Sequence, residues 1–370
     1  MKALLLSEPS KLGVIHMPLP DPAPGEVLIR IAACGICGSD VHGYDGSSGR
    51  RIPPLVMGHE AAGTVAALGD GVRQFAPGDR VTFDSTVYCG DCDYCLAGDV
   101  NLCDRREVIG VSCGDYRRHG AFAEYVVVPE RIVYRLPDAL AFAEAAMLEA
   151  VSVALHAVRQ AALPGGETTL VVGAGMIGLL TLQAARAAGC SRVIIADVDP
   201  SRLALARQMG ADEAINTAGS GTLGSGTSGS GASGPDLIAE VHRLTGGKGV
   251  DVVFEAVGRN ETVFAAIDSV RKGGIVVLIG NITPEVTLPL QKVVSRQIRL
   301  QGTAASSGEY PEAIELMRTG AIRVGPLITA VAPLEDGPQW FERLHRGEPN
   351  LMKVVLAPTA PPSASGESAA

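Results

Sequence analysis

The sequence predicts an α/β protein with two domains, a compact β-rich domain followed by an open, doubly wound sheet of parallel strands. Its 370 residues exceed what one small core requires, and length alone favours two domains. Up to about residue 136, short apolar runs are punctuated by Gly, Pro and Asp, a pattern typical of a loop-rich β domain. From about residue 141, strand and helix patterns alternate, which is typical of βαβ units around a parallel sheet.

The second half of the chain supplies the individual elements of this sheet. The run LEAVSVALHAVRQAAL predicts a helix that ends at the Pro-Gly pair behind it. Strands are expected at 169–172 and 193–197 with a helix between them, and Asp199 has the position of an N-cap before the next helix. The later runs VDVVFEAVG and GGIVVLIGN are typical of strands buried on both faces. We therefore place the β-rich domain at 1–145 and the parallel-sheet domain at 146–302.

Two segments lack the apolar residues needed to order themselves. Residues 218–234 are rich in Gly and Ser, and we expect a flexible loop on the sheet domain. Residues 358–370 have a similar composition, and we expect a disordered tail.

Charge and hydropathy exclude several kinds of partner. The formal net charge is -9, and there is no block rich in Lys and Arg, so we expect neither nucleic acid nor an anionic membrane as a partner. The N-terminal run MKALLLSEPS is too short for a secretory signal, and no stretch approaches the roughly 18 apolar residues of a membrane-spanning helix. We expect a soluble, cytoplasmic protein, in which eight cysteines serve as metal ligands and buried thiols.

Four cysteines form the strongest local motif. The run CGDCDYCLAGDVNLC contains Cys89, Cys92, Cys95 and Cys103 with gaps of two, two and seven residues. Four thiolates satisfy tetrahedral Zn²⁺ completely and leave no position for a substrate. The spacing therefore predicts a structural zinc site.

A glycine fingerprint, GAGMIG, lies between a predicted strand and a predicted helix. The first glycine permits a tight turn, the second lets the backbone approach a pyrophosphate, and the third allows close helix packing. At the end of the next strand, Asp197 favours NAD over NADP because a carboxylate accepts hydrogen bonds from the ribose hydroxyls and repels a 2′-phosphate. The alternative is a surface acid at a strand end. The expected cofactor residues are Gly173, Gly175, Met176, Ile177, Gly178, Asp197 and Arg202.

A second, sparser set of possible ligands lies in the N-terminal domain. Cys37 in CGICGSDVHGY and His59 with Glu60 in MGHEAAG supply one thiolate, one imidazole and one carboxylate. Three such ligands leave a fourth position open for water or an alcohol, as a catalytic zinc site requires. Taken alone, a His-Glu pair is more often a surface or capping feature. Tyr44, Arg50 and Arg51 follow His42 and could orient substrate hydroxyls or a phosphorylated sugar alcohol, although exposed arginines near a glycine-rich turn are usually solvated.

Together these motifs resemble the zinc-dependent medium-chain dehydrogenases, in the branch that contains sorbitol, other polyol and threonine dehydrogenases. The resemblance extends from Met1 to about Leu356 and includes the segment LEAVSVALHA. It implies a GroES-like β-rich catalytic domain, a Rossmann coenzyme domain and a segment, 303–357, that returns to the catalytic domain. It also implies a homodimer or homotetramer, for which the strand VVLIG could extend across a subunit boundary.

The resemblance also implies roles for individual residues. Cys37, His59 and Glu60 surround the catalytic zinc, with Glu149 close by as an exchanging ligand or a supporting acid. The catalytic proton relay occupies Ser39 and His42, with the nicotinamide ribose between them, and Arg296 lies beside the substrate hydroxyls.

The function that follows is an enzyme with one catalytic zinc, one structural zinc and NAD per chain. We expect it to oxidise a small secondary alcohol, a polyol or sugar alcohol, to the ketone. The alternatives are an amino-alcohol dehydrogenase of the same fold, acting on a substrate like threonine, and a zinc-ribbon binding protein. The acidic charge balance counts against the zinc ribbon.

Overall fold

The computed structural model describes residues 1–113, 116–219 and 236–358, and it divides the chain into two compact units. The first unit contains Met1–Glu149 and the chain from Leu327 onward, and the second contains Ala150–Pro326. The expected flexible loop, apart from residues 218 and 219, and nearly all of the expected tail lie outside the described residues. Within the described ranges, no helix combines the length and apolar character needed to cross a membrane.

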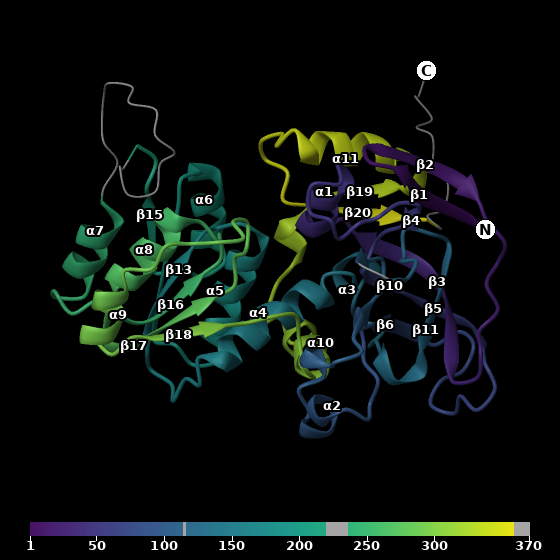
Figure 1. The fold of residues 1–370 in the computed structure, drawn as a ribbon, viewed down its shortest axis with the longest axis horizontal. Helices are drawn as coiled ribbons and strands as arrows, with labels where there is room; N and C mark the ends of the chain where they lie inside the picture. The colour runs from purple at the N-terminus through teal and green to yellow at the C-terminus, as the bar shows by residue number, and fades with distance from the viewer. Residues whose placement is uncertain (114–115, 220–235, 359–370) are drawn as a thin grey trace, which may run out of the picture. The chain divides into compact units, whose positions relative to one another are not determined.

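The first unit is built on a mixed sheet in the order β12-β6-β5-β3-β20-β19, with β11 paired beside β3 (Figure 1). Its central strand β3 is apolar at most positions and buried along most of its length, so that both faces are covered. The strands are β3 (Glu26–Gly35), β5 (Glu60–Leu68), β6 (Arg80–Phe83), β11 (Tyr125–Pro129), β12 (Val133–Arg135), β19 (Ile328–Pro333) and β20 (Lys353–Ala357).

Smaller sheets and short helices complete this unit. A three-stranded sheet has the order β2-β1-β4, and two further pairs are β7 with β8 and β9 with β10. The strands are β1 (Lys2–Glu8), β2 (Lys11–His16), β4 (Leu55–Val56), β7 (Thr86–Val87), β8 (Glu107–Val108), β9 (Ser112–Cys113) and β10 (Tyr116–Arg117). The helices are α1 (Gly38–Tyr44), α2 (Asp93–Ala97), α3 (Phe142–Ala145) and α11 (Gly337–His345).

One apolar core joins the N-terminal strands to the C-terminal return segment. Phe122 and Phe341 meet edge to face with ring centroids 5.7 Å apart, and both side chains are fully buried. Val354 and Leu356 of β20 belong to the same cluster as Ile29. The segment from Leu327 onward is therefore part of the core of the first unit.

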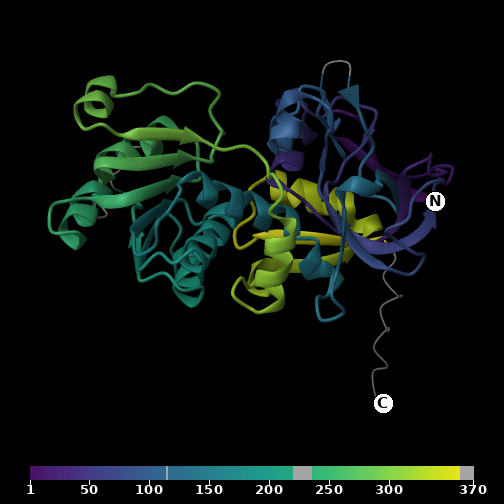
Figure 2. The same ribbon diagram turned by 90° about the horizontal axis from the view of Figure 1, so that it is seen from below.

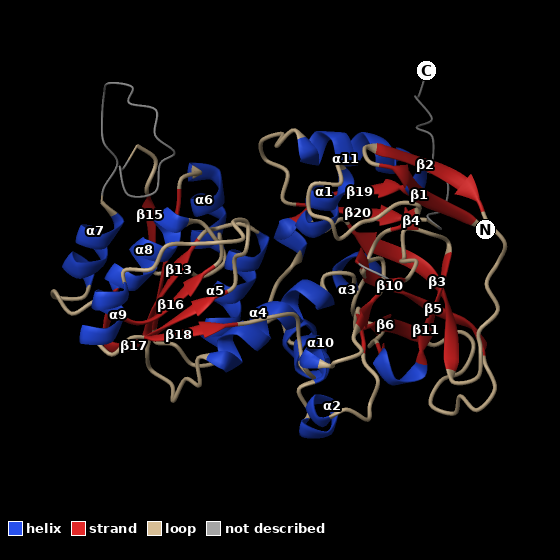
Figure 3. Ribbon diagram, in the orientation of Figure 1, coloured by secondary structure: helices blue, strands red, loops and turns tan. Residues whose placement is uncertain are grey.

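The second unit is a six-stranded parallel sheet in the order β15-β14-β13-β16-β17-β18, with helices on both sides (Figures 2 and 3). The order reverses between β13 and β16, as in doubly wound dinucleotide-binding folds. The strands are β13 (Thr168–Val172), β14 (Arg192–Asp197), β15 (Glu213–Asn216), β16 (Val250–Glu255), β17 (Val270–Leu278) and β18 (Arg299–Gly302). The helices are α5 (Met176–Ala187), α6 (Pro200–Gln208), α7 (Leu237–Leu244), α8 (Asn260–Ser269), α9 (Leu290–Ser295) and α10 (Tyr310–Arg318). The predicted fold class is confirmed.

Two details differ from the sequence expectations. The second unit extends to Pro326, beyond the expected boundary at residue 302. In addition, the segment VVLIG belongs largely to β17, which pairs with β16 on one side and β18 on the other. Because both of its edges are already paired, β17 has no free edge to offer a second subunit, and that expectation was wrong.

A buried carboxylate explains why the chain stays with the second unit past residue 302. Glu309, before α10, is fully buried, and its Oε1 lies 2.9 Å from His156 Nδ1 and 2.8 Å from Arg159 Nη1 on α4 (Leu148–Gln160). The side chain of Gln183 makes two further hydrogen bonds to the backbone of Arg323. Burial alone would raise the pKa of Glu309, but hydrogen bonds from His156 and the Ser307 N–H lower it below its ordinary value.

We expect Glu309→Gln to destabilise the protein by roughly 2 kcal/mol at pH 7, because it removes charge-assisted hydrogen bonds at a buried site. A carboxyl with a lowered pKa stabilises the fold above its unfolded pKa and loses that contribution as pH falls through the folded value. In urea titrations, the difference between wild type and variant should therefore be full at pH 7 and shrink below about pH 4.

Glu312→Gln is the matched control, since Glu312 pairs with the same Arg159 at an exposed position. It should cost less than about 1 kcal/mol. Equal losses of unfolding free energy in the two variants at pH 7 would contradict the stabilising role of buried Glu309.

Candidate functional site

The pairing of β3 with β5 brings the sparse ligand set together in the first unit. Cys37 follows the end of β3 and is the N-cap of α1, while His59 and Glu60 stand at the start of β5. In the antiparallel register Gly35 lies opposite Glu60, so segments more than twenty residues apart meet at one end of the sheet. One ligand atom from each of Cys37, His59 and Glu60 lies within 4.8 Å of the others.

Two glycines make room for this arrangement. A Cβ on Gly35 would lie 2.3 Å from Glu60 Oε2, so a side chain there would displace the carboxylate. Gly58 adopts φ 94°, and a Cβ on it would lie 2.8 Å from the ring of Phe122. A glycine before His59 is therefore needed for the backbone conformation that places His59 beside Cys37.

Asp40 contacts two of the three possible ligands, Cys37 and His59. No local pattern in the sequence indicated this role. Its Oδ2 accepts a hydrogen bond from the Cys37 N–H at 3.3 Å, and its Oδ1 lies 3.4 Å from His59 Nδ1. A carboxylate at Nδ1 leaves Nε2 of the imidazole for a metal. Burial would raise the pKa of Asp40, but the charges on His59 and Arg51 outweigh it and hold the pKa well below its usual range.

A buried lysine from the C-terminal segment holds the third ligand. Lys353 Nζ donates to Glu60 Oε2 at 2.5 Å and to the Ile36 carbonyl at 3.1 Å. Burial would lower the pKa of Lys353, but the charge on Glu60 outweighs it and raises the pKa. Because β20 carries this lysine, the return of the chain to the first unit is part of the site.

Glu149 stands at the end of the first unit in the first turn of α4. Burial of its carboxyl raises the pKa of Glu149 to about 7, and the negative charges on Glu60 and Asp84 add to this effect. Among the described residues, the compact ligand group contains Cys37, His59 and Glu60 and does not include Glu149. This geometry suits a nearby acid better than a permanent ligand.

The expected relay residues lie on α1. Ser39 and His42 are both exposed, and Ser39 Oγ accepts a hydrogen bond from Arg51 Nη2 at 3.0 Å. Two residues expected to face the substrate are engaged elsewhere. The Tyr44 hydroxyl donates to the Ser10 carbonyl at 2.9 Å, and the guanidinium of Arg296 donates to the carbonyls of Ile267 and Val270.

The donor chemistry of this group fits zinc. Sulfur, imidazole nitrogen and carboxylate oxygen are the three donors that zinc accepts in proteins, and three of them leave one tetrahedral position open. Asp40 and Lys353 hydrogen-bond to residues of the ligand group, and such outer partners commonly orient metal ligands.

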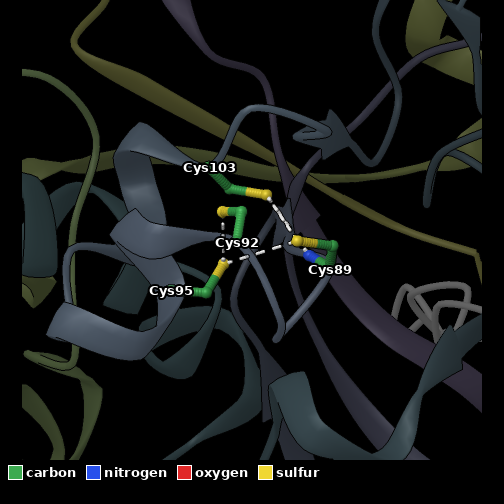
Figure 4. Close-up of side chains that lie close together, drawn as sticks. All are labelled: Cys89, Cys92, Cys95 and Cys103. Carbon is green, nitrogen blue, oxygen red and sulfur yellow. Dashed lines mark hydrogen bonds between the residues drawn. The ribbon is translucent and has the colours of Figure 1, made fainter.

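The four cysteines of the second ligand group converge around one point (Figure 4). Cys92 caps the N-terminus of α2 and Cys95 lies within that helix, while Cys89 precedes it and Cys103 follows the 3₁₀ turn Val100–Leu102. Sulfur–sulfur distances are 3.5 Å from Cys92 to Cys95, 3.4 Å from Cys103 to Cys89 and 3.8 Å from Cys89 to Cys95. A tetrahedron with Zn–S bonds of about 2.3 Å has edges of about 3.8 Å, so the cage fits zinc.

Backbone amides also point at this cage. The N–H groups of Cys89 and Arg105 donate to Cys103 Sγ at 3.3 and 3.4 Å. Such donors stabilise the negative thiolate that a metal ligand must be. All four cysteines are free of disulfide bonds.

The glycine fingerprint occupies the turn from β13 to α5 in the second unit. Gly173 adopts φ 100°, and a Cβ on Gly178 would lie 1.8 Å from the Gly173 carbonyl oxygen. Gly175 is the N-cap of α5, and a Cβ there would meet nothing within 4 Å. Met176 and Ile177 begin the helix. The space beside Gly175 lets another group approach the start of α5, as a phosphate-binding turn requires.

Asp197 ends β14 and also holds the glycine turn, a second role that the sequence did not indicate. Its Oδ2 accepts from the Ala174 N–H at 2.6 Å and its Oδ1 from the Asp199 N–H at 2.9 Å. Arg202 lies 3.6 Å from Asp199, which is the N-cap of α6. Arg202 therefore has an acidic partner of its own at the start of α6.

We expect Cys92→Ser to lower the zinc content from about two ions to about one per chain and to lower the melting temperature, because the cage contributes to folding. Metal analysis and thermal unfolding measure both effects. Cys113→Ser, at an exposed cysteine outside both ligand groups, is the control and should retain both ions. Two ions retained in Cys92→Ser would refute the cage.

We expect Asp197→Asn to weaken NAD binding by about 10- to 100-fold, which corresponds to roughly 1.5–3 kcal/mol of charge-assisted hydrogen bonding. The ratio of NADP to NAD affinity should rise. Titration of each cofactor against protein fluorescence provides the measurement. Asp199→Asn keeps the helix cap and should change NAD affinity little, and identical behaviour of the two variants would argue against the assignment.

Comparison with known proteins agrees with this geometry. The model of the alcohol dehydrogenase GroES-like domain matches residues 23–138, and that of the zinc-binding dehydrogenase matches residues 177–319. The chain is 33% identical to a sorbitol dehydrogenase of Bacillus subtilis, over 97% of each chain. It is 36% identical to an L-idonate 5-dehydrogenase of Vitis vinifera, over 91% of this chain and 89% of that one.

A solved structure extends the likeness to three dimensions. A zinc-binding dehydrogenase from Sinorhizobium meliloti, bound to NADP, shares 31% identity and aligns with a TM-score of 0.83 over 96% of this chain and 99% of its own. The likeness in sequence and in fold thus extends over nearly the whole length of the chain. The chain belongs to the zinc-binding alcohol dehydrogenase family, the medium-chain dehydrogenases with a GroES-like catalytic domain.

Proposed function

We propose that this enzyme oxidises the secondary hydroxyl of a polyol or sugar alcohol to a ketone. The carbinol carbon gives a hydride to NAD, the hydroxyl gives a proton to solvent, and the products are the ketone, NADH and H⁺. The observation that carries the proposal is the convergence of Cys37, His59 and Glu60 into a three-ligand group with one coordination position to spare. The names of the polyol-oxidising relatives support this substrate class.

The catalytic unit supplies binding and proton transfer. Zinc held by Cys37, His59 and Glu60 would act as a Lewis acid that makes an alcohol hydroxyl more acidic. Ser39 stands exposed two residues from Cys37, where its hydroxyl can accept the proton that the alcohol loses. His42 is exposed on the same helix, and an imidazole exchanges protons with water near neutral pH.

The other groups have supporting roles in the proposal. Glu149, with its pKa raised to about 7, is a nearby acid that can hold or release a proton close to neutral pH. The turn of Gly173 to Gly178 binds the cofactor pyrophosphate, and Asp197 selects NAD over NADP. The cysteine cage holds a second zinc for structure.

Homo-oligomerisation stays a prediction, and the structure suggests another edge for it. β18 pairs only with β17 within the described residues, and Ile282, Leu290 and Val294, nearby in the sequence, are each more than half exposed. Exposed apolar residues and an unpaired strand edge are each typical of subunit contacts. Cytoplasmic localisation also stays a prediction.

A substrate panel tests the proposal. Polyols, sugar alcohols, their phosphates and amino alcohols such as threonine would each be offered with NAD, and NADH absorbance would be followed. We expect turnover with polyols or sugar alcohols. Turnover with amino alcohols alone would establish the competing substrate class, and no turnover with any alcohol would overturn the proposal.

Cys37→Ser tests the metal's role in the same assay. Loss of one of three ligands should remove one zinc per chain and at least a thousandfold of kcat/KM, within the range that metal catalysis supplies. Wild-type activity of Cys37→Ser in zinc-free buffer would contradict the mechanism. Cys34→Ser, at a neighbouring buried cysteine outside the ligand group, is the matched control.

A further inference from the structure

Arg51 is a buried cation beside the proposed relay, where the sequence suggested a solvated arginine. Only 4% of its surface is exposed. Its Nε and Nη2 donate to Asp40 Oδ1 at 3.0 and 2.8 Å, and Nη1 donates to the Arg50 carbonyl at 3.0 Å. The same Nη2 also donates to Ser39 Oγ at 3.0 Å. One guanidinium therefore reaches both the carboxylate that supports the ligands and the hydroxyl of the relay.

The surrounding chain is shaped to hold this side chain. The hydroxyl of Ser112 accepts from the Ile52 N–H at 2.7 Å and donates to the Ile52 carbonyl at 2.9 Å, which fixes the backbone next to Arg51. On the other side, a Cβ on Gly43 would lie 2.1 Å from Arg51 Cγ. Helix α1 can therefore lie against the arginine stem only because residue 43 is a glycine.

The chemistry of the two side chains gives this contact a consequence. A serine hydroxyl has one hydrogen to donate and two lone pairs to accept with, whereas a guanidinium only donates and stays charged. The bond from Arg51 occupies one lone pair of Ser39 Oγ. One lone pair is left to receive a proton and one hydrogen is left to pass on, which are the two functions that a relay needs. The positive charge of the guanidinium also stabilises negative charge that develops on the Ser39 oxygen when its hydrogen leaves.

We propose that Arg51 is a positioning residue that sets the orientation of the Ser39 hydroxyl for proton transfer. This inference rests on the proposed function. The proposed role depends on the hydrogen bond from Arg51 to Ser39. The support that Arg51 gives to Asp40 depends on other hydrogen bonds of the same guanidinium. Arg51 acts through Ser39 and needs no contact with substrate.

A double-mutant cycle separates the two effects. Arg51→Met should lower kcat by about 10- to 100-fold, part of the 10²–10⁴ that proton transfer contributes, with KM changed less than about threefold. The solvent isotope effect on kcat should increase, since proton transfer becomes slower. In a Ser39→Ala background, Arg51→Met should lower kcat per bound zinc clearly less than it does in the wild-type background, and it should leave the isotope effect unchanged.

Fully additive effects of Arg51→Met and Ser39→Ala, or an unchanged solvent isotope effect, would overturn the proposal. So would a loss of kcat that merely follows a loss of zinc, which metal analysis of each variant detects. Crystals of Arg51→Met provide a readout independent of activity, because the Ser39 hydroxyl should leave its original rotamer. An unaltered Ser39 rotamer would also count against the proposal.

Two further variants keep the test decisive. Arg30→Met, at an exposed arginine on β3, should match wild type in every readout. If Arg51→Met does not fold, Arg51→Lys keeps the charge but loses the fork that reaches both partners, and it should show the same change in kcat and isotope effect. Wild-type behaviour of Arg51→Lys would overturn the proposal. Wild-type enzyme that oxidises no alcohol would refute the proposed function itself, before any variant is compared.

Discussion

The antiparallel register between β3 and β5 is the constraint on which the catalytic site depends. With Gly35 opposite Glu60, the end of one strand delivers Cys37 and the start of the other delivers His59 and Glu60 to the same place. A shift of one residue would turn every side chain of a strand to the opposite face. The buried apolar residues on both strands hold the register, so the core of the unit and the geometry of the ligands have a single origin.

Burying several charges at this place requires partners for each of them. Asp40 is paired with Arg51, and Glu60 with Lys353, and all four side chains are almost completely buried. An unpaired buried charge would cost several kcal/mol, so these partners are needed for the acids to stay ionised. The partners come from the loop before the GHE triplet and from the last strand of the unit. The ligands occupy short motifs, but the residues that support them come from segments far apart in the sequence of the first unit.

Sequence reasoning succeeded where a motif is local. The cysteine cage and the glycine turn are each contained in one short segment whose spacing matches one geometry, and the structure places these residues together. The grouping of Cys37 with His59 and Glu60 was a hypothesis from their donor types that the family resemblance strengthened, because their proximity depends on strand pairing and not on local spacing. Lys353 and Arg51 left no local signal, since a lysine in an apolar strand and an arginine beside a glycine-rich turn have ordinary surface explanations. The expected domain boundary near residue 302 also differs from the structure because no local pattern indicates the contact that sets it. The contact from Glu309 to α4 spans about 150 residues.

The central claim is that Cys37, His59 and Glu60 hold a zinc ion that is distinct from the one in the cysteine cage. Diffraction from crystals of the purified protein, measured on both sides of the zinc absorption edge, tests it most directly. The account predicts two anomalous peaks per chain, one inside the cage and one at about 2.3 Å from Cys37 Sγ and about 2.0–2.1 Å from a ring nitrogen of His59. A single peak confined to the four cysteines, in protein that oxidises alcohols, would contradict it.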